Sequence, residues 1–524
     1  MHSDELSTVP PRVAEVVSSS ATRQQYGRWA AILLVILTVV GLALRVWRLG
    51  NWSFEGDEIF TLRDSLHPRF TNARPLIYFL NYYLVSPVVP LDELGLRILP
   101  ALFGVLAIPA LYFMTRRLVG TRAALFATLL LTFNAYQVHQ SQYARYWSLV
   151  FLFSAIYPYA LYVGVRDRNR SWAVLGLVTA VLAMLGHPTA VLLIGGLALF
   201  LASYLRGEHL RDLWNQKSVR WAALIVLILL VVIGLRYLLV LHSWIFERPL
   251  RAVGGADHLL HSPRGLFVKQ AAIMLSYTDA VSLPVMLIGG VGIYLLWQGR
   301  DRSLGLLLTC LFIFPVVSIL LLSLRTAVST TYLIPTMPII FIAGGVFLDR
   351  LAHVSRELRP PWLIAAVVTA IVLLAGAPTL VSQYRDGRRN DFRRAAGWLD
   401  QHLGPRDVVL SDQVRTLSHY LLTTKPQSLV ADSASLTQSV RMLHDSGGTG
   451  TLWVVKPEAA QGGHRTNSGL GGLNAWIYQN CQLRNSIGIA RLDFRHNELE
   501  IYHCPVSASG ITPPATISAP GGGR

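Results

Sequence analysis

The feature that most constrains this fold is a series of long apolar stretches separated by short basic loops. Residues 171–205 contain no Lys, Arg, Asp or Glu, and these 35 residues are too long for one membrane crossing. The sequence Gly186-His187-Pro188 divides them, because glycine and proline interrupt helices. Only 14% of the chain is charged and its mean hydropathy is +0.44, whereas a soluble protein contains about 25% charged residues. The sequence therefore predicts a multi-pass membrane protein.

Eleven membrane-spanning helices are predicted, since a span needs about 17–25 predominantly apolar residues. The predicted spans are Trp29–Trp47, Leu96–Thr115, Ala123–Val138, Trp147–Val165, two within Ser171–Leu205, Trp221–Leu241, Val281–Trp297, Ser303–Leu324, Thr331–Leu348 and Pro361–Val381. The segment Pro75–Val89 is also apolar, but we expect it to lie along the outer membrane interface, where tyrosines favour the headgroup level.

The distribution of basic residues supports this topology. With eleven spans and a cytoplasmic N-terminus, the short inner loops hold fifteen Lys and Arg residues and the short outer loops hold two, Arg145 and Arg325. A twelfth span at Pro75–Val89 would reverse this asymmetry. The net charge of +17 comes from short clusters between apolar runs rather than from one basic face, so nucleic acid is not an expected partner. We predict a protein of the plasma (inner) membrane whose C-terminal region is extracytoplasmic.

Four regions are predicted along the chain. Residues 1–28 form a disordered cytoplasmic N-terminus, 29–382 the transmembrane catalytic domain, 383–507 a soluble extracytoplasmic α/β domain, and 508–524 a disordered tail. In the soluble region, Asp391–Leu403 predicts a helix, whereas Asp407–Ser411 and Gly450–Lys456 predict strands.

Two cysteines fall in the predicted outer domain. Cys481 and Cys504 flank a predicted hairpin, Ile487–His503. Because an outer compartment permits disulfides, we expect these two residues to pair.

An acid pair, Asp57–Glu58, follows the first span by about ten residues. Acids beside a membrane span are either solvated or functional, so a solvated acidic loop is the alternative to a reaction site. The predicted topology places further polar residues on the same outer face: Arg74, Gln142, Arg145, Tyr146, His187 and Arg325.

These residue types together indicate displacement at a sugar carbon with a lipid-linked phosphate as the leaving group. The planar guanidinium of arginine bonds two phosphate oxygens and stays charged. A carboxylate nearby can accept the proton of an attacking hydroxyl. For the individual residues other interpretations stay open: Arg145 and Arg325 as anchors at headgroups, and His187 as a loop histidine with satisfied hydrogen bonds.

Several motifs resemble a known family in their order along the chain. They are Leu44-Arg45, Gly56-Asp57-Glu58, Arg74-Pro75-Leu76, Glu93-Leu-Gly-Leu-Arg97-Ile-Leu-Pro100-Ala-Leu-Phe-Gly104, Arg116-Arg117-Leu118-Val119-Gly120 and Ser141-Gln142-Tyr143-Ala144-Arg145-Tyr146. This order resembles the GT-C membrane glycosyltransferases, in the glycosyltransferase family 39 branch of protein O-mannosyltransferases and bacterial aminoarabinose transferases. The resemblance covers Trp29–Leu205, and more loosely the stretch from Arg325 to Pro335.

The resemblance implies an all-α polytopic membrane bundle of the GT-C type, with juxtamembrane helices in the first outer loop, in front of the α/β domain. It also implies a polyprenyl-phosphate sugar donor and an inverting single displacement outside the cytoplasm. By position, Asp57 matches the acid that deprotonates or orients the acceptor hydroxyl, and Glu58 matches its supporting neighbour. The implied donor-phosphate ligands are Arg74, Arg145 and Arg325, and the implied substrate-binding residues are Gln142, Tyr146 and His187.

The chain also departs from these relatives. It lacks the His-Pro-Pro run and the β-trefoil domain of the protein O-mannosyltransferases, and it has no second-loop aspartate of the kind found in aminoarabinose transferases. The sugar therefore stays open, as does the acceptor, which is a protein, a lipid or a cell-envelope glycan. Some relatives elsewhere in the superfamily use a divalent metal, and Asp57 and Glu58 could bind one. No ligand motif supports a metal cofactor here.

Two other functions are compatible with parts of the sequence. A transporter or flippase of lipid-linked sugar would explain Arg236 within the seventh predicted span, but no internal repeat is visible and the charges gather at the outer ends of the spans. A receptor or scaffold acting through residues 383–507 would explain that domain but not the acid pair. An enzyme explains both, and we take it as the prediction.

Overall fold

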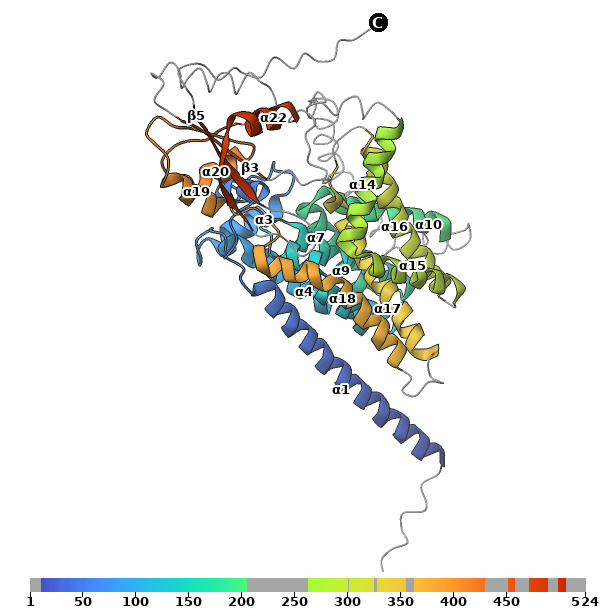
Figure 1. The fold of residues 1–524 in the computed structure, drawn as a ribbon. Coiled ribbons are helices and arrows are strands. Elements are labelled where there is room, and N and C mark those ends of the chain that lie inside the picture. Colours follow the sequence, from blue (N-terminus) through green and yellow to red (C-terminus); the bar gives the residue numbers. More distant parts are fainter. Residues whose placement is uncertain are drawn as a thin grey trace, which may run out of the picture.

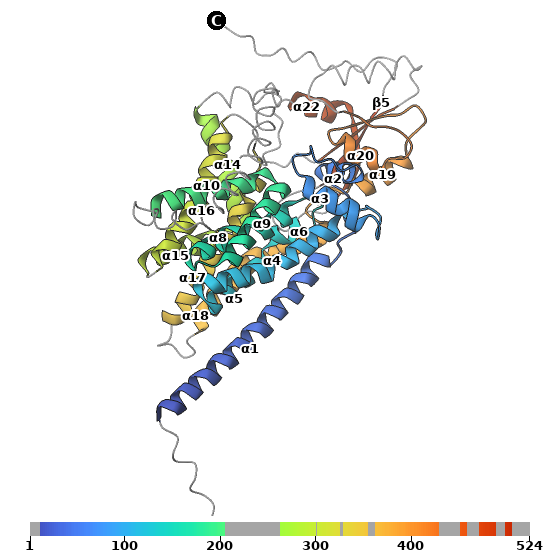
Figure 2. The ribbon, with the colours of Figure 1, turned by 180° about the vertical axis from the view of Figure 1, so that it is seen from behind.

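The computed structural model describes residues 11–204, 263–299, 301–324, 328–354, 362–428, 451–457, 471–488 and 498–505. A helical bundle makes up most of it, and a small sheet lies at one end (Figures 1 and 2). Both views place the sheet at the end of the bundle where helix α1 (Pro11–Val46) finishes, next to α2 (Gly56–Leu66). The first outer loop and the sheet therefore share one face of the molecule.

Six helical segments of the described chain are long and apolar enough to cross a membrane, and each coincides with a predicted span. They are Arg28–Val46 within α1; α4 (Gly95–Val119); α7 (Trp147–Ser154) with α8 (Tyr157–Arg166); α16 (Arg302–Leu322); η4 (Thr330–Thr336) with α17 (Met337–Val354); and Leu363–Arg385 within α18 (Leu363–Asp386). A seventh exists if α14 (Pro263–Val281) and α15 (Leu283–Gln298) count as one span, although they meet at a bend of 92°.

The predicted number of eleven spans is not confirmed. Three predicted spans correspond to apolar helices that are shorter than the rest: α5 (Thr121–Phe133), α9 (Arg170–Gly186) and α10 (Val191–Tyr204). At about 1.5 Å per residue such helices rise only about 20–26 Å, less than the hydrocarbon core of about 30 Å. The break between α9 and α10 falls at η2 (Pro188–Ala190), where the Gly-His-Pro sequence predicts it. The predicted span Trp221–Leu241 lies outside the described residues.

The structure assigns a helix to part of the N-terminal segment. The sequence predicts disorder up to residue 28, but α1 already begins at Pro11. Proline is favoured in the first helical turn, and the helix then continues without interruption into the first span. The predicted disordered tail, residues 508–524, lies outside the described residues.

Helix α17 is the centre of the bundle. Its span is 83% buried, whereas the spans of α1 and α18 are 17% buried and form the periphery. Glycines allow neighbouring helices to approach α17 closely, because a Cβ on Gly292 of α15 would overlap the Ala343 carbonyl oxygen. On the other side of α17, a Cβ on Gly345 would overlap the Ala123 carbonyl oxygen of α5. The bundle centre therefore has little room for rearrangement.

The apolar part of the first outer loop does not cross the bundle. It forms α3 (Pro75–Leu80) and η1 (Asn81–Val85), which at about 1.5 Å per residue together reach only about 16 Å. The side chains of Tyr83 and Leu84 are 63% and 60% exposed. An exposed, short apolar helix of this kind fits the predicted interfacial segment.

The C-terminal region forms a five-stranded mixed sheet with strand order β2-β1-β3-β5-β4. The strands are β1 (Val408–Ser411), β2 (Gln427–Ser428), β3 (Thr451–Pro457), β4 (Gln482–Ile487) and β5 (Leu499–Pro505). Strand β1 pairs in parallel with β2 and β3, whereas β5 runs antiparallel to β3 and β4.

Helices cover both faces of this sheet. The alternating residues of β3 send Trp453 and Val455 towards α19 (Phe392–Asp400) and α20 (Val414–Tyr420). Leu452 and Val454 instead pack with α22 (Gly471–Asn480). The structure joins Cys481, just after α22, to Cys504 of β5 in a disulfide. These elements agree with the α/β arrangement and with the helix and strands predicted at 391–403, 407–411 and 450–456.

Candidate active site

The acid pair lies at the start of α2, where the local sequence forms a capping box. Glu55 is the N-cap residue, and its side chain accepts a hydrogen bond from the backbone N–H of Glu58. In return, Glu58 Oε2 accepts a hydrogen bond of 2.9 Å from the Glu55 backbone N–H. This reciprocal pair satisfies two donors at the helix start and fixes the direction in which Asp57 and Glu58 project.

Glu58 is fully buried and bonded to two arginines. Arg97 Nε donates to Oε1 and Arg97 Nη2 donates to Oε2, both at 2.9 Å. Arg389 Nη1 donates to Oε2 at 2.8 Å. Arg97 also donates to the carbonyl oxygens of the loop that follows α1, at Leu49, Trp52 and Ser53. We call Glu58, Arg97 and Arg389 the buried triad.

The buried triad keeps Glu58 ionised. Burial by itself would raise the pKa of the Glu58 carboxyl, but the charges of Arg389 and Arg97 and the hydrogen bonds to the carboxylate lower it from 4.5 to about 2. A buried charge without such partners would be very unfavourable. The carboxylate is therefore a fixed structural anion, and both of its oxygens are already engaged.

The same triad holds in place the loop between α6 (Ala135–Ser141) and α7, which we call the second outer loop after its predicted position. The backbone N–H of Ala144 donates to Glu58 Oε1 at 2.7 Å, and Arg389 Nη2 donates to the Gln142 carbonyl oxygen at 3.2 Å. The Gln142 side chain donates to the carbonyl oxygens of Leu44 and Trp47 at the end of α1. Gln142 is fully buried, so its observed contacts are those of a residue that positions backbone.

Asp57 points in a different direction from its neighbour. Its side chain is 58% exposed, and Oδ2 lies 3.6 Å from Arg145 Nη2. Arg145 Nη1 also donates to the Asp57 carbonyl oxygen at 3.0 Å. Arg145 itself is buried, so its charge is held beside the exposed carboxylate. One acid of the pair is thus built into the structure while the other faces a cavity.

Two arginines and a histidine surround Tyr146. The guanidinium carbons of Arg74 and Arg145 each lie 4.8 Å from the centre of its ring. His187 stacks on the same ring with 4.9 Å between centroids, and Tyr332 lies 5.5 Å from His187. Burial raises the pKa of Tyr146 to about 12, so its hydroxyl stays protonated and can donate. We call Arg74, Arg145, Tyr146 and His187 the cationic cluster.

The cationic cluster has capacity for an anion. Arg74 Nε and Arg145 Nε are buried and have no hydrogen-bond partner in the part of the chain that the structure describes. Within that part, the contact of Arg145 with Asp57 is the one ion pair that either guanidinium makes. A phosphate placed here would receive donors from both guanidinium groups. Arg325, the third predicted phosphate ligand, lies outside the described residues.

Sequence reasoning missed Arg97, Arg389 and Tyr332. Arg97 occurs in a motif that the sequence analysis singled out, but its partner lies 39 residues earlier. Arg389 follows the last predicted span. A basic residue on the predicted outer side of that span could have been recognised from the sequence as a candidate site residue. No local sequence pattern indicates that either arginine bonds Glu58.

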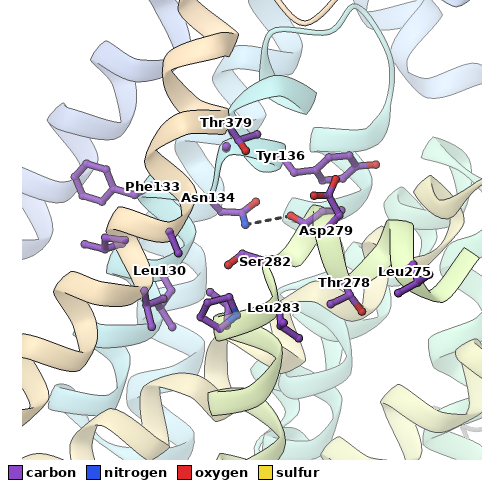
Figure 3. Close-up of a pocket in the computed structure, with 18 of the residues that line it drawn as sticks. Leu130, Phe133, Asn134, Tyr136, Leu275, Thr278, Asp279, Ser282, Leu283 and Thr379 are labelled. Atoms are coloured by element: carbon purple, nitrogen blue, oxygen red, sulfur yellow. Dashed lines mark hydrogen bonds between the residues drawn. The ribbon is translucent and has the colours of Figure 1, made fainter. Parts of the chain in front are cut away.

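Two cavities lie near these residues. The larger, of about 520 Å³, is lined by Asp57 and its neighbours in α2, by Tyr143, and by residues from Asn390 to Pro457 that belong mainly to the sheet domain. A second, of about 330 Å³, lies at the bend between α14 and α15 (Figure 3). There Asn134 donates to the carbonyl oxygens of Ala280 and Val281, and Ser282 has a φ of 80°. This second cavity does not include Asp57 among its lining residues.

A metal site at the acid pair does not fit the observed contacts. Both oxygens of Glu58 accept hydrogen bonds from guanidinium and backbone N–H groups, which leaves no free carboxylate of this residue for a cation. In the described parts of the chain, no group of three His, Cys, Asp or Glu side chains is arranged to hold a metal ion.

Sequence and structure comparisons relate the chain to known proteins. The sequence model of the dolichyl-phosphate-mannose-protein mannosyltransferase family matches residues 74–236, the segment that contains the cationic cluster. A search of curated proteins finds no match to the chain.

Solved structures share the fold over most of the chain. ArnT from Cupriavidus metallidurans in the apo state has a TM-score of 0.52 at 16% identity, over 91% of this chain and 98% of that chain. The same protein bound to undecaprenyl phosphate has a TM-score of 0.51 at 16% identity, over 92% and 98%. The apo oligosaccharyltransferase of Archaeoglobus fulgidus has a TM-score of 0.50 at 13% identity, over 82% and 69%. The chain has an ArnT-like fold, and the resemblance to GT-C glycosyltransferases that the motifs indicate is confirmed.

The buried triad generates a stability prediction. Replacing Glu58 by Gln removes the anion and leaves Arg97 and Arg389 buried without a counterion, so we expect the free energy of unfolding to fall by about 3–5 kcal/mol. Because the folded-state pKa of Glu58 lies below the ordinary 4.5, this stabilisation is present above about pH 4.5 and is lost as the pH falls towards 2.

The measurement is unfolding of purified wild-type and Glu58→Gln protein in detergent between about pH 2 and 8, which includes the window in which Glu58 takes up a proton. Asp64→Asn is the matched control, because Asp64 lies in the same helix and pairs with the exposed Arg63. Equal stability of Glu58→Gln and wild type at pH 7 would contradict the assigned role of the triad.

Proposed function

We propose that this protein is an inverting glycosyltransferase that moves a sugar from a polyprenyl-phosphate donor to a hydroxyl group outside the cytoplasm. The observation that carries the proposal is the contact between Arg145 and Asp57, which puts an exposed carboxylate next to a cluster with capacity for an anion. The ArnT structure with undecaprenyl phosphate and the family match over 74–236 support a lipid-phosphate donor.

In the proposed reaction the donor phosphate binds to Arg74 and Arg145, and the Tyr146 hydroxyl donates to one of its oxygens. Asp57 accepts the proton of the acceptor hydroxyl as the oxygen bonds to the anomeric carbon of the sugar. The bond from that carbon to the phosphate oxygen breaks at the same time, and its electron pair leaves with the lipid phosphate. Guanidinium groups stabilise the charge that grows on the phosphate. Attack opposite to the leaving group inverts the anomeric configuration.

The remaining predicted site residues, His187, Glu58 and Gln142, do not take part in proton transfer in this proposal. His187 and the Tyr146 ring stack behind the phosphate position. Glu58 and Gln142, which the sequence analysis placed in the site, act as positioning residues because the described contacts engage them with protein groups. We propose no metal cofactor.

The distribution of basic residues gives a proposed membrane orientation. We propose the plasma (inner) membrane with a cytoplasmic N-terminus, on the basis of the fifteen-to-two split of basic residues. Residues 383–507 then form an extracytoplasmic domain on the side of Asp57. Contacts between α20 and the first outer loop support this, since the Tyr420 hydroxyl donates to Glu93 Oε1 at 2.6 Å.

One observation favours a second function, the transport of lipid-linked sugar. Transporters use broken helices around a substrate site, and α14 and α15 meet at 92° beside a cavity. A transporter would move the donor across vesicle membranes without releasing the lipid phosphate, whereas a glycosyltransferase releases it. Release of polyprenyl phosphate in the presence of an acceptor therefore separates the two functions.

Replacement of the proposed base tests the enzyme directly. We expect Asp57→Asn to bind the donor normally and to lower the transfer rate by at least about a hundredfold, the usual worth of a positioned base. The measurement is transfer from labelled polyprenyl-phosphate sugar by purified protein, with Asp64→Asn in the same helix as control. A wild-type rate in Asp57→Asn would show that the exposed acid is only part of a solvated loop.

Arg74→Lys tests the phosphate position. Lysine keeps the charge but cannot form the two parallel hydrogen bonds of a guanidinium group, so we expect the donor KM to rise about tenfold, equal to about 1.4 kcal/mol. Arg63→Lys, at an exposed arginine of α2, is the control and should leave the donor KM unchanged. An unchanged KM in Arg74→Lys would remove Arg74 from the donor site.

The orientation can be tested with the native cysteines. After reduction of intact cells, an impermeant maleimide should label Cys481, which is partly exposed and lies in the proposed outer domain; its disulfide partner Cys504 is buried and should react little. Cys310, which is buried within α16, is the internal control and should stay unlabelled. Labelling that requires broken membranes would place the sheet domain in the cytoplasm.

A further inference from the structure

The larger cavity joins the proposed catalytic base to the sheet domain. Its volume is about 520 Å³, within the range of roughly 300–1,000 Å³ of small-molecule sites. One wall comes from the start of α2 and includes Asp57 and Phe60. The opposite wall comes from the loop after β1, through Gln413, and from the start of α20, through Arg415. Figure 2 shows α2 and α20 next to each other at the end of the bundle.

Close contacts hold the two walls together. A Cβ on Gly56 would lie 2.8 Å from Gln413 Oε1, so the absence of a side chain at the first residue of α2 lets Gln413 approach. The Arg415 guanidinium lies 4.5 Å above the ring of Phe60.

Other contacts fix the sheet domain without lining the cavity. The backbone N–H of Phe54 donates to the Tyr420 hydroxyl at 2.6 Å, and Arg393 forms an ion pair with Glu93. When Gln413 or Arg415 is changed, these other contacts still dock the domain.

The cavity lining has the chemistry of a saccharide site. It combines carboxylates, amides, a guanidinium group and aromatic rings: Glu55, Asp57, Asp412, Asn390, Gln413, Arg415, Phe60, Tyr143 and Phe392. Sugar hydroxyls donate to carboxylate and amide oxygens and accept from amide and guanidinium N–H groups. The apolar faces of sugar rings pack against aromatic rings.

One atom of the cavity lining, the side-chain oxygen of Asn390, is an acceptor that lacks a hydrogen-bond donor among the described residues. Asn390 Oδ1 is buried and has no hydrogen-bond partner among the residues that the structure describes. An unsatisfied buried acceptor is unfavourable, and a ligand hydroxyl would satisfy it. Three carboxylates against one arginine in the lining disfavour an anionic headgroup in the same place.

We infer that this cavity is the acceptor subsite, that the acceptor is a neutral saccharide end, and that Gln413 and Arg415 of the sheet domain select it. This inference rests on the proposed function, because it assumes that Asp57 activates the acceptor. It assigns the sheet domain a role in substrate choice. The α2 wall of the subsite contributes the base, Asp57, and the sheet-domain wall contributes Gln413 and Arg415, which select the acceptor.

The test uses purified full-length protein and two measurements. The first is direct binding of a panel of neutral di- and trisaccharides by isothermal titration calorimetry, which needs no turnover. The second is transfer of sugar from labelled polyprenyl-phosphate donors to the same saccharides, to a serine- and threonine-containing peptide and to an anionic glycolipid. The variants are Gln413→Ala and Arg415→Ala, with Arg394→Ala as control, since Arg394 is exposed on α19 and does not line the cavity.

We expect a saccharide of the panel to bind, and each of the two variants to raise its Kd and its acceptor KM about tenfold, the effect of losing one hydrogen bond. The donor KM should change less than about twofold, and Arg394→Ala should match wild type. Saccharide affinity that Gln413→Ala and Arg415→Ala leave unchanged would overturn the subsite, as would transfer to the peptide or the glycolipid alone. Saccharide binding without release of lipid phosphate from any donor would instead overturn the proposed function and leave the saccharide site standing.

Discussion

The carboxylate of Glu58, buried between Arg97 and Arg389, is the interaction on which the rest of the site depends. It joins the start of α2, the loop after α1, the second outer loop and the segment after α18. A buried ion network of this kind is stable only when every charge is paired and every donor is satisfied, and Arg97 meets this condition with five hydrogen bonds. The network fixes the backbone on either side of Asp57 and next to Arg145.

The neighbouring acids Asp57 and Glu58 thus have different roles, because the geometry of α2 points their side chains in different directions. Successive residues of an α-helix project about 100° apart, so Glu58 points into the protein while Asp57 faces the cavity. The carboxylate and the two guanidinium groups of the triad bond one another and nearby backbone groups, and in the proposed site Asp57, Arg74 and Arg145 are then the groups that bind substrate. The sheet domain then closes the outer side of the cavity through Gln413 and Arg415.

Local signals in the sequence predicted much of the fold. Apolar length identified six spans, and the Gly-His-Pro sequence located the break between α9 and α10. The number of spans was not confirmed, because apolar content does not distinguish a short helix such as α5 from a full crossing. In the site, topology alone brought Asp57, Arg74 and Arg145 to one face. The roles of Arg97 and Arg389 depend on contacts 39 and 331 residues apart, which no local pattern encodes.

The most direct test of the proposed chemistry is the fate of the donor and the configuration of the product. Purified protein is incubated with a polyprenyl-phosphate sugar of defined anomeric configuration, labelled at the anomeric carbon, and with a saccharide acceptor. Single displacement driven by Asp57 predicts equal amounts of polyprenyl phosphate and glycosylated acceptor, with the anomeric configuration inverted. Retention of configuration, or transport of the donor with no release of polyprenyl phosphate, would contradict it.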